Sequence, residues 1–171
     1  MNTMSAFVND QAPVELTVRF YNLYRPDSVL IRGQVKSTEI TKGAASDLEA
    51  ERLLLRAGDE VYRIRRIRHR KGRNFLVEDA MLPAELVPGL ADATTIADDV
   101  SLLAEQYGIL LGKAEERISM ATAPPAIAHI LAIAPGTPVL LLDRIVHLLD
   151  EPRPVEWRIA IATFPTGTTL K

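Results

Sequence analysis

The chain has 171 residues, of which 47% are hydrophobic and 25% charged, with a formal net charge of −2 and no cysteine. This size and composition fit one soluble globular domain that buries most of its apolar surface. The slightly acidic balance argues against a general polyanion binder, and the lack of cysteine excludes disulfides, thiolate chemistry and cysteine-type zinc sites.

The sequence suggests neither a membrane span nor a signal peptide. No apolar run approaches the ~18 residues that cross a bilayer. The opening MNTMSAFVNDQAPVE has neither the basic start nor the apolar core of a signal peptide. We therefore expect a cytoplasmic protein with no membrane partner, in which residues 1–13 form a flexible segment and residues 14–171 form the domain.

The first half of the domain is predicted to contain strands and one helix. Residues 14–21 alternate apolar and polar side chains, which is typical of a strand, and residues 28–40 form a second extended segment. Ser46 followed by Glu49 is a capping box, so a helix should begin there and run to Ala57, before a glycine. Two strands follow on either side of the turn HRKGRN.

The second half is predicted to repeat this alternation. A loop leads into a helix at VSLLAEQY, with Asp98 and Asp99 at its start and Gly108 at its end. The segment EERISMATA reads as extended, Thr122 is expected to cap a third helix that continues through AIAHILAIAPG, and two strands close the chain. Few strands are linked as βαβ units, so we expect an α+β fold with a central antiparallel sheet flanked by helices.

An internal repeat is the strongest pattern in the sequence. Shifting the chain by 78 positions superposes Arg66 on Arg144 and Glu78 on Glu156. Six further identities at this offset, again without a gap, are Gly58 with Gly136, Val61 with Val139, Ile67 with Ile145, His69 with His147, Ala50 with Ala128 and Leu53 with Leu131. We therefore expect two related halves, each a helix plus a hairpin, that share one sheet.

The alternation of side chains in the first hairpin predicts that some of its charged residues face the interior. Residues at i and i+2 lie on one face of a strand, so Arg66 and Arg68 share a face. A turn centred on Gly72 places Arg66 opposite Glu78 as a cross-strand pair. Arg66 and Glu78 lie on otherwise apolar faces, and buried charges need partners.

The two copies of the repeat differ at one charged position. Arg144 and Glu156 repeat the pair of the first half, but Val146 stands where the first half has Arg68. We therefore expect Arg68 to bring uncompensated positive charge that an anionic ligand satisfies. The alternative is that Arg66 with Glu78, and Arg144 with Glu156, are purely structural ion pairs.

The basic hairpin allows other interpretations. Seven Lys or Arg fall within the eleven residues from Arg63 to Arg73, yet a hairpin with basic turn residues is most often only solvated. Direct nucleic-acid binding is disfavoured because aromatic interleaving and a helix suited to a groove are missing from this stretch. The histidines have no metal-ligand spacing and no phosphate loop occurs, so we expect no metal and no cofactor.

Several blocks resemble a known family. The stretch RIRHRKGRNFLVEDAMLPAELVPGL, followed in order by YGILLGKAEERISMATA, LAIAPGTPVLLLDR and PVEWR, is similar to the UTRA domain, the effector-sensing half of GntR-type transcription regulators of the HutC subfamily. The resemblance runs from Ser46 to Arg158. It implies the chorismate lyase fold and a pocket floored by the sheet that binds a small effector. Family members also form homodimers through this domain.

The resemblance assigns candidate ligand-binding residues. The family's Arg-x-Arg maps to Arg66 and Arg68, its strand glutamate to Glu78, its helix-start serine to Ser101 and its late glutamate to Glu156. No catalytic or metal-binding residue is implied. DNA binding would belong to a winged helix-turn-helix domain that precedes this domain in the family, so we expect this chain to be either a fragment of a longer regulator or a free-standing sensor.

The sequence also departs from the family pattern. Ala162 and Thr163 stand where members usually carry an aromatic residue and an arginine, and Asn74 replaces a proline after the hairpin glycine. The effector is therefore expected to be smaller than, or of another class from, the phosphosugars. SAFVND faintly resembles a family loop, which makes Phe7 and Asn9 further candidates.

Two alternatives to a sensor remain open. A lyase of the chorismate lyase type needs an inward arginine for the substrate carboxylate and a glutamate near the reacting ether, roles that Arg66 and Glu156 would fill. A dimerisation module with a vestigial pocket is the third possibility. The sequence favours the sensor but does not name its effector.

Overall fold

The computed structural model describes residues 23–24, 30–31 and 34–164. The strand predicted at residues 14–21 and the candidates Phe7 and Asn9 lie outside the described residues. The elements in chain order are β1 (Leu23–Tyr24), β2 (Leu30–Ile31), β3 (Gln34–Ala44), α2 (Asp47–Leu53), β4 (Glu60–Arg70), β5 (Arg73–Pro83), the 3-10 turns η1 (Ala84–Leu86) and η2 (Leu90–Asp92), α3 (Val100–Tyr107), β6 (Leu111–Thr122), α4 (Pro125–Leu131), β7 (Pro138–Leu148) and β8 (Pro154–Ala162).

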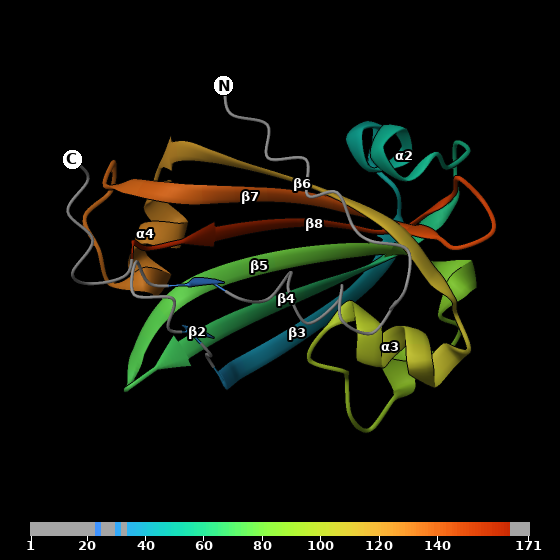
Figure 1. Cartoon of the computed structure of the whole chain (residues 1–171), viewed down its shortest axis with the longest axis horizontal. Helices are drawn as coiled ribbons and strands as arrows, with labels where there is room; N and C mark the ends of the chain where they lie inside the picture. The colour runs from blue at the N-terminus through green and yellow to red at the C-terminus, as the bar shows by residue number, and fades with distance from the viewer. Residues whose placement is uncertain (1–22, 25–29, 32–33, 165–171) are drawn as a thin grey trace.

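The fold is the predicted α+β type, built on one antiparallel sheet (Figure 1). Its six strands lie in the order β3-β4-β5-β8-β7-β6, and β1 pairs with β2 in a separate two-stranded ribbon. The hairpin turn lies at Lys71 and Gly72, both with positive φ, and it places Arg66 opposite Glu78 as parity predicted.

The two halves of the sheet are structurally equivalent. Shifted by 78 positions, the bounds of α2 fall on those of α4, and the bounds of β4 fall on those of β7. The strand order is symmetric about the contact between β5 and β8. There Ala80 lies opposite Arg158, and the same shift maps Ala80 onto Arg158. The pseudo-two-fold axis therefore passes between these two residues.

Both repeat helices end earlier than predicted. The capping box of Ser46 and Glu49 is present at the start of α2, but Leu54 adopts a left-handed conformation with φ of 54° and ends the helix. Its counterpart Ala132, with φ of 53°, ends α4. Thr122 does not cap α4, because it belongs to β6 and Pro124 occupies the N-cap position.

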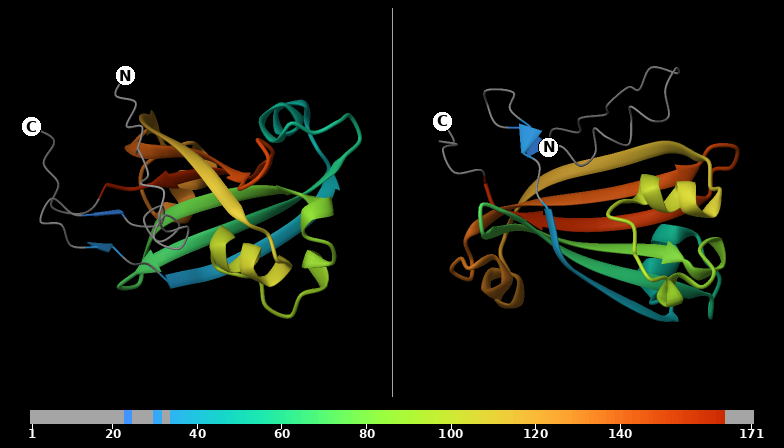
Figure 2. Two further views of the ribbon diagram at one scale, coloured as in Figure 1. Left: turned by 45° about the vertical axis from the view of Figure 1, so that its right-hand side comes forward. Right: turned by 90° about the horizontal axis from the view of Figure 1, so that it is seen from below.

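The two faces of the sheet are covered differently. The helical face, as we call the side on which α2 and α4 lie (Figure 2, right), packs Leu53 of α2 on Val61, Met81 and Trp157. The opposite side, the charged face, is covered at one end by the segment from η1 to α3. There Leu90, Ala97 and Leu103, with neighbouring residues, pack on Tyr62, Ile64, Ala80 and Leu82. None of the described helices is long and apolar enough to cross a membrane.

Candidate functional site

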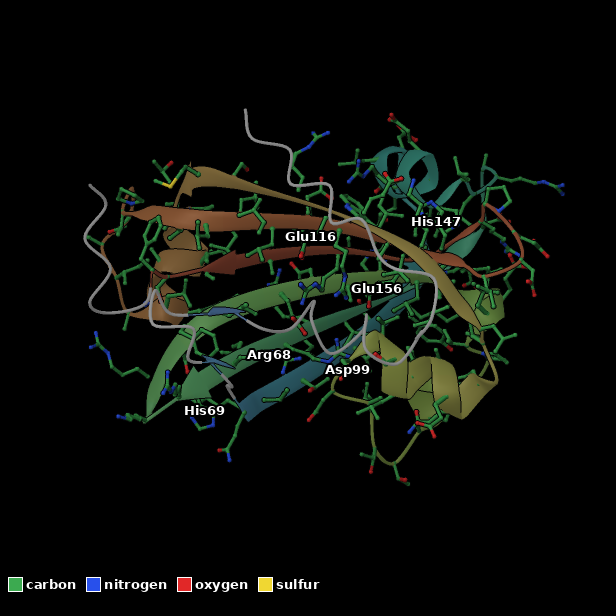
Figure 3. All side chains as sticks on the ribbon, in the orientation of Figure 1. Arg68, His69, Asp99, Glu116, His147 and Glu156 are labelled. Carbon is green, nitrogen blue, oxygen red and sulfur yellow. The ribbon has the colours of Figure 1, made fainter. Side chains whose placement is uncertain are left out.

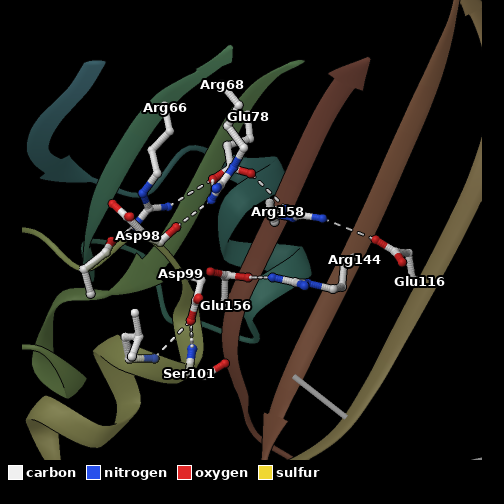
Figure 4. A network of polar contacts seen from close by, with 12 residues as sticks. Arg66, Arg68, Glu78, Asp98, Asp99, Ser101, Glu116, Arg144, Glu156 and Arg158 are labelled. Carbon is white, nitrogen blue, oxygen red and sulfur yellow. Dashed lines mark hydrogen bonds and ion pairs between the residues drawn. The ribbon is translucent and has the colours of Figure 1, made fainter. Parts of the chain in front are cut away.

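A network of buried charges occupies the middle of the charged face (Figure 4). Four arginines and three glutamates reach it from five strands, and among them Arg66, Arg144 and Arg158 are at most 2% exposed and Glu78 and Glu156 at most 1%. The members are Arg66 and Arg68 of β4, Glu78 of β5, Glu156 and Arg158 of β8, Arg144 of β7 and Glu116 of β6.

Glu78 is the hub of this network. Its Oε2 accepts a hydrogen bond from Nη1 of Arg158 at 2.9 Å, and its Oε1 lies 3.2 Å from Nη2 of Arg68 and 3.4 Å from Nη1 of Arg66. Burial by itself raises the pKa of Glu78, but the charges of the three arginines outweigh burial, so the pKa is lowered from its ordinary value. Glu78 is therefore a carboxylate at neutral pH.

The same arginines hold the loop that precedes α3. Nη2 of Arg66 donates to the carbonyl oxygen of Ala97 at 2.6 Å, and Nη2 of Arg68 donates to that of Asp98 at 2.6 Å. Asp99 then caps the helix, accepting from the backbone N–H of Ser101 at 2.9 Å. The start of α3 is thus tied directly to the guanidinium groups of β4.

The second half of the network uses a different register. Arg144 donates to Oε1 of Glu156 at 2.6 Å, so the predicted pair is present. However, Glu156 lies opposite Val146, and Arg144 lies opposite Arg158. Two like charges directly opposite are destabilising unless carboxylates neutralise them. Glu156 forms an ion pair with Arg144. Arg158 forms ion pairs on both sides, with Glu78 and, at 3.4 Å, with Glu116.

The expectation that Arg68 carries uncompensated charge is wrong. Val146 stands at the position of Arg68 in the second half, and this difference predicts an unbalanced arginine only if each glutamate pairs with one arginine. In the structure Glu78 is shared among three arginines, and the Asp98 carbonyl gives Arg68 a further acceptor. Arg68 is still the most accessible arginine of the network, with 13% of its side chain exposed.

Ser101 lies beside the network rather than in it. It is half-buried in the first turn of α3, and Asp99 already accepts from its backbone N–H. Only its hydroxyl group is therefore available as a direct ligand contact. The structure thus brings Arg66, Arg68 and Glu78 into mutual contact, and it places Glu156 in a neighbouring pair and Ser101 at the edge.

Sequence reasoning missed Arg158 and Glu116. Both residues stood within the blocks that carry the family resemblance, but neither was assigned a role. The repeat contained a signal for Arg158, because its counterpart at the same offset is Ala80, a second asymmetry like that of Arg68 and Val146. Glu116 gave no comparable signal, since its partner lies two strands away across β7.

The residues that depart from the family pattern have structural roles. Nδ2 of Asn74 donates to the carbonyl oxygen of Ile130 at 2.8 Å and so links the basic hairpin to α4. Ala162 is fully buried. Thr163 continues the pairing of β8, with its N–H 2.9 Å from the carbonyl oxygen of Phe75.

The lyase alternative requires Arg66 and Glu156 to act on one substrate. In the structure Arg66 is bonded to Ala97 and Glu78, and Glu156 to Arg144. The two groups therefore serve different parts of the network.

His69 and His147 do not form a cluster. His69 and His147 lie at opposite ends of the molecule (Figure 3). Within the described residues, no group of three or more His, Cys, Asp or Glu side chains is arranged to hold a metal ion.

The helical face carries a groove of about 510 Å³ whose floor includes Met81, Trp157 and Ile159. Four of its five lining charges are engaged in two ion pairs, and the fifth, that of Glu39, is negative. Arg65 donates twice to Asp79, at 2.7 Å each, and Arg63 pairs in the same way with Glu49. Because these charges neutralise one another at the surface, we place the candidate anion site on the charged face instead.

Comparisons with known proteins agree with the fold and the motif blocks. The family model for the UTRA domain matches residues 32–163. The ligand-binding domain of a protein described as a GntR-family transcriptional regulator from Bordetella bronchiseptica is 26% identical, with a TM-score of 0.68 over 82% of this chain and 92% of that chain.

Two further solved structures share the fold at lower identity. A GntR-family transcriptional regulator from Enterococcus faecalis V583 is 23% identical, with a TM-score of 0.65 over 82% of this chain and 99% of that chain. The effector domain of PhnF from Mycobacterium smegmatis is 22% identical, with a TM-score of 0.67 over 77% of this chain and 80% of that chain.

Proposed function

This chain belongs to the UTRA domain family, and we propose that it senses a small anionic or polar metabolite for a bacterial GntR-type regulator of the HutC subfamily. The metabolite binds on the charged face and changes DNA binding by a winged helix-turn-helix domain of the regulator, in the cytoplasm. The observation that carries the proposal is the buried arginine network, in which Arg68 is the accessible member.

The charge of the network suits an anion. Among the described residues it contains four arginines and three glutamates, so guanidinium groups outnumber carboxylates within the network itself, not counting Asp98 and Asp99 of the adjoining loop. Guanidinium groups bind carboxylates and phosphates through paired, charge-assisted hydrogen bonds. An anion at Arg68 gains this interaction in a site that is largely screened from water.

The contacts of Arg68 also suggest how binding is transmitted. The carbonyl oxygen of Asp98 and an incoming anion compete for the same guanidinium group. A ligand that takes this place weakens the tie between β4 and the start of α3. Binding can shift the regulator between two states only if the ligand prefers one of them. We propose that the two states differ in the position of residues 97–107.

A melting screen tests the proposal. The protein is heated with small carboxylates, phosphates, phosphosugars and amino acids, each beside its neutral amide or alcohol analogue. Binding to the folded state raises the melting temperature. We expect a stabilising compound among the anions and none among their neutral analogues. Stabilisation by neutral compounds alone would refute an anion site.

Two arginine variants then locate the site. We expect Arg68→Gln to weaken binding of the compound by at least about tenfold, which corresponds to ~1.4 kcal/mol. Arg73→Gln, at the exposed start of β5, should leave affinity unchanged and serves as the control. Equal loss in both variants would indicate a diffuse charge effect. Incubation with chorismate and an assay for pyruvate tests the lyase alternative, and we expect no pyruvate.

A further inference from the structure

One end of the sheet is strongly basic. It is the end at which the turn between β4 and β5 lies (Figure 1, lower left). Four cationic side chains stand there, and we call them the basic end: Lys36 of β3, Arg70 of β4, Lys71 of the turn and Arg73 of β5. All of them except the half-buried Arg70 are exposed.

The surroundings of the basic end contain no carboxylate among the described residues. The strands reach this end through stretches without Asp or Glu, namely residues 34–38, 66–77, 117–142 and 157–164. Further along the same hairpin, Arg63 and Arg65 form ion pairs with carboxylates. The basic end forms no such pair within the part of the chain that the structure describes. Its charge is therefore open to a partner from outside.

The opposite end of the sheet is acidic. This acidic end consists of residues 45–60, 84–92 and 148–153, which together contain nine Asp or Glu and three Arg. Because β4 spans 11 residues between the two ends, at ~3.4 Å per residue they lie roughly 35 Å apart. Salt at 0.1 M screens exposed charges over ~10 Å. The basic end therefore attracts anions although the net charge of the chain is −2.

The repeat indicates that the hairpin does not need these cations to fold. The shift of 78 positions maps Lys71 and Arg73 onto Leu149 and Glu151, in the turn between β7 and β8. That turn closes the equivalent hairpin, yet it carries Asp150 and Glu151 and lies at the acidic end (Figure 1, right). The positive charge is thus a property of one copy and not a requirement of the fold.

We propose that the basic end is a contact surface for the phosphate backbone of duplex DNA, independent of base sequence. Duplex DNA carries one negative charge per ~1.7 Å of its axis. Lys and Arg contacts to phosphates position a protein on the duplex without reading its bases. Base readout needs a groove-binding element that this hairpin does not have, but phosphate contacts need only accessible cations.

This inference rests on the proposed function, in which a winged helix-turn-helix domain brings the regulator to DNA and supplies sequence recognition. The start of the sheet suits such an arrangement. β3 begins at Gln34, which pairs with His69 of β4 beside the hairpin turn. A DNA-binding domain that precedes this domain is therefore linked from the side on which the basic end lies.

Fluorescence anisotropy tests the proposal with the chain alone and two labelled duplexes of unrelated sequence. At low salt, about 50 mM, we expect weak binding with the same Kd for both duplexes. Lys36→Gln combined with Lys71→Gln should raise this Kd at least about threefold. The loss of two phosphate contacts should also reduce the slope of log Kd against log salt concentration by ~1.8, at ~0.9 per contact.

Arg56→Gln combined with Lys113→Gln is the matched control. Both residues are exposed cations on the far side of the molecule from the basic end, and this double variant removes the same two charges. Its Kd and salt slope should match those of wild type, and both double variants should melt with wild type because all four side chains are exposed.

Three results would overturn the DNA contact: wild type that does not bind the duplexes at low salt, equal loss of affinity in the two double variants, or tighter binding to a polyglutamate peptide than to the duplexes. Equal loss would indicate an effect of net charge, and preference for polyglutamate would indicate an acidic protein partner. The melting screen for the effector depends on other residues, so a failure of the anion site and a failure of the DNA contact are distinguished.

Discussion

Replacing Glu78 by glutamine tests whether the buried network holds the sheet together. Glu78 is fully buried and shared by Arg66, Arg68 and Arg158. The substitution keeps the shape of the side chain but removes the carboxylate that all three arginines contact. Removing one partner of a buried ion pair costs about 3–5 kcal/mol, because the remaining charge is left in a site screened from water.

The expected size of this effect is measurable. For a domain of this length, each kcal/mol lowers the melting temperature by roughly 2–4 °C, so Glu78→Gln should melt about 6–20 °C below wild type. Circular dichroism melting at neutral pH is sufficient, provided that the transition is cooperative and reversible.

The neighbouring residue on β5 provides the control. Asp79 lies on the helical face, with its side chain 37% exposed and paired with Arg65. Exposed pairs contribute about 1 kcal/mol or less, so Asp79→Asn should melt within a few degrees of wild type. If both variants melt close to wild type, the network does not stabilise the fold, and the reasoning about the hub is wrong.

Four further predictions follow from the same structure. The pKa of Glu78 is lowered in the folded protein, so the stabilisation that its carboxylate gives is complete above the ordinary pKa of 4.5. This stabilisation is lost as the pH falls through the lower pKa of the folded state. The melting temperature of Glu78→Gln should therefore fall less on acidification than that of wild type. In Gly112→Ala the new Cβ would lie 2.6 Å from the carbonyl oxygen of Leu148, so the free energy of unfolding measured in urea should fall by about 1–3 kcal/mol. In Gly43→Ala the new Cβ would meet only the end of the flexible Arg63 side chain at 3.4 Å, so the free energy of unfolding should fall less. Ala132→Gly should gain about 0.5–1 kcal/mol in the same assay by relieving the left-handed conformation, and an unchanged midpoint would contradict this. The chain alone, with a net charge of −2, should give no sequence-dependent gel shift with duplex DNA at physiological salt.

The sequence predicted the repeat and the pairing of the first hairpin because both depend on local information. A fixed offset of 78 positions and the parity of β4 and β5 suffice to place Arg66 opposite Glu78. The predicted ends of the two helices were wrong because Leu54 and Ala132 adopt left-handed conformations that are usually found at glycine.

The rest of the site depends on contacts that the sequence does not encode locally. The role of Arg158 follows from the pairing of β8 with β5 and β7, which joins distant parts of the chain, and strand parity fixes a face but not this register. The partners of Arg66 and Arg68 in the loop before α3 are backbone carbonyls, which any residue type supplies. The composition of that loop therefore gave no indication of its place over the site.

The most direct test of the central claim is to find which face of the sheet binds the effector. The anion that gives the largest melting shift is titrated into the isotopically labelled protein, and backbone amide shifts are followed by nuclear magnetic resonance. We expect the largest changes at Arg66, Arg68 and residues 97–101 on the charged face. The largest changes at Ser46, Thr41 and the rest of the groove on the helical face would contradict it.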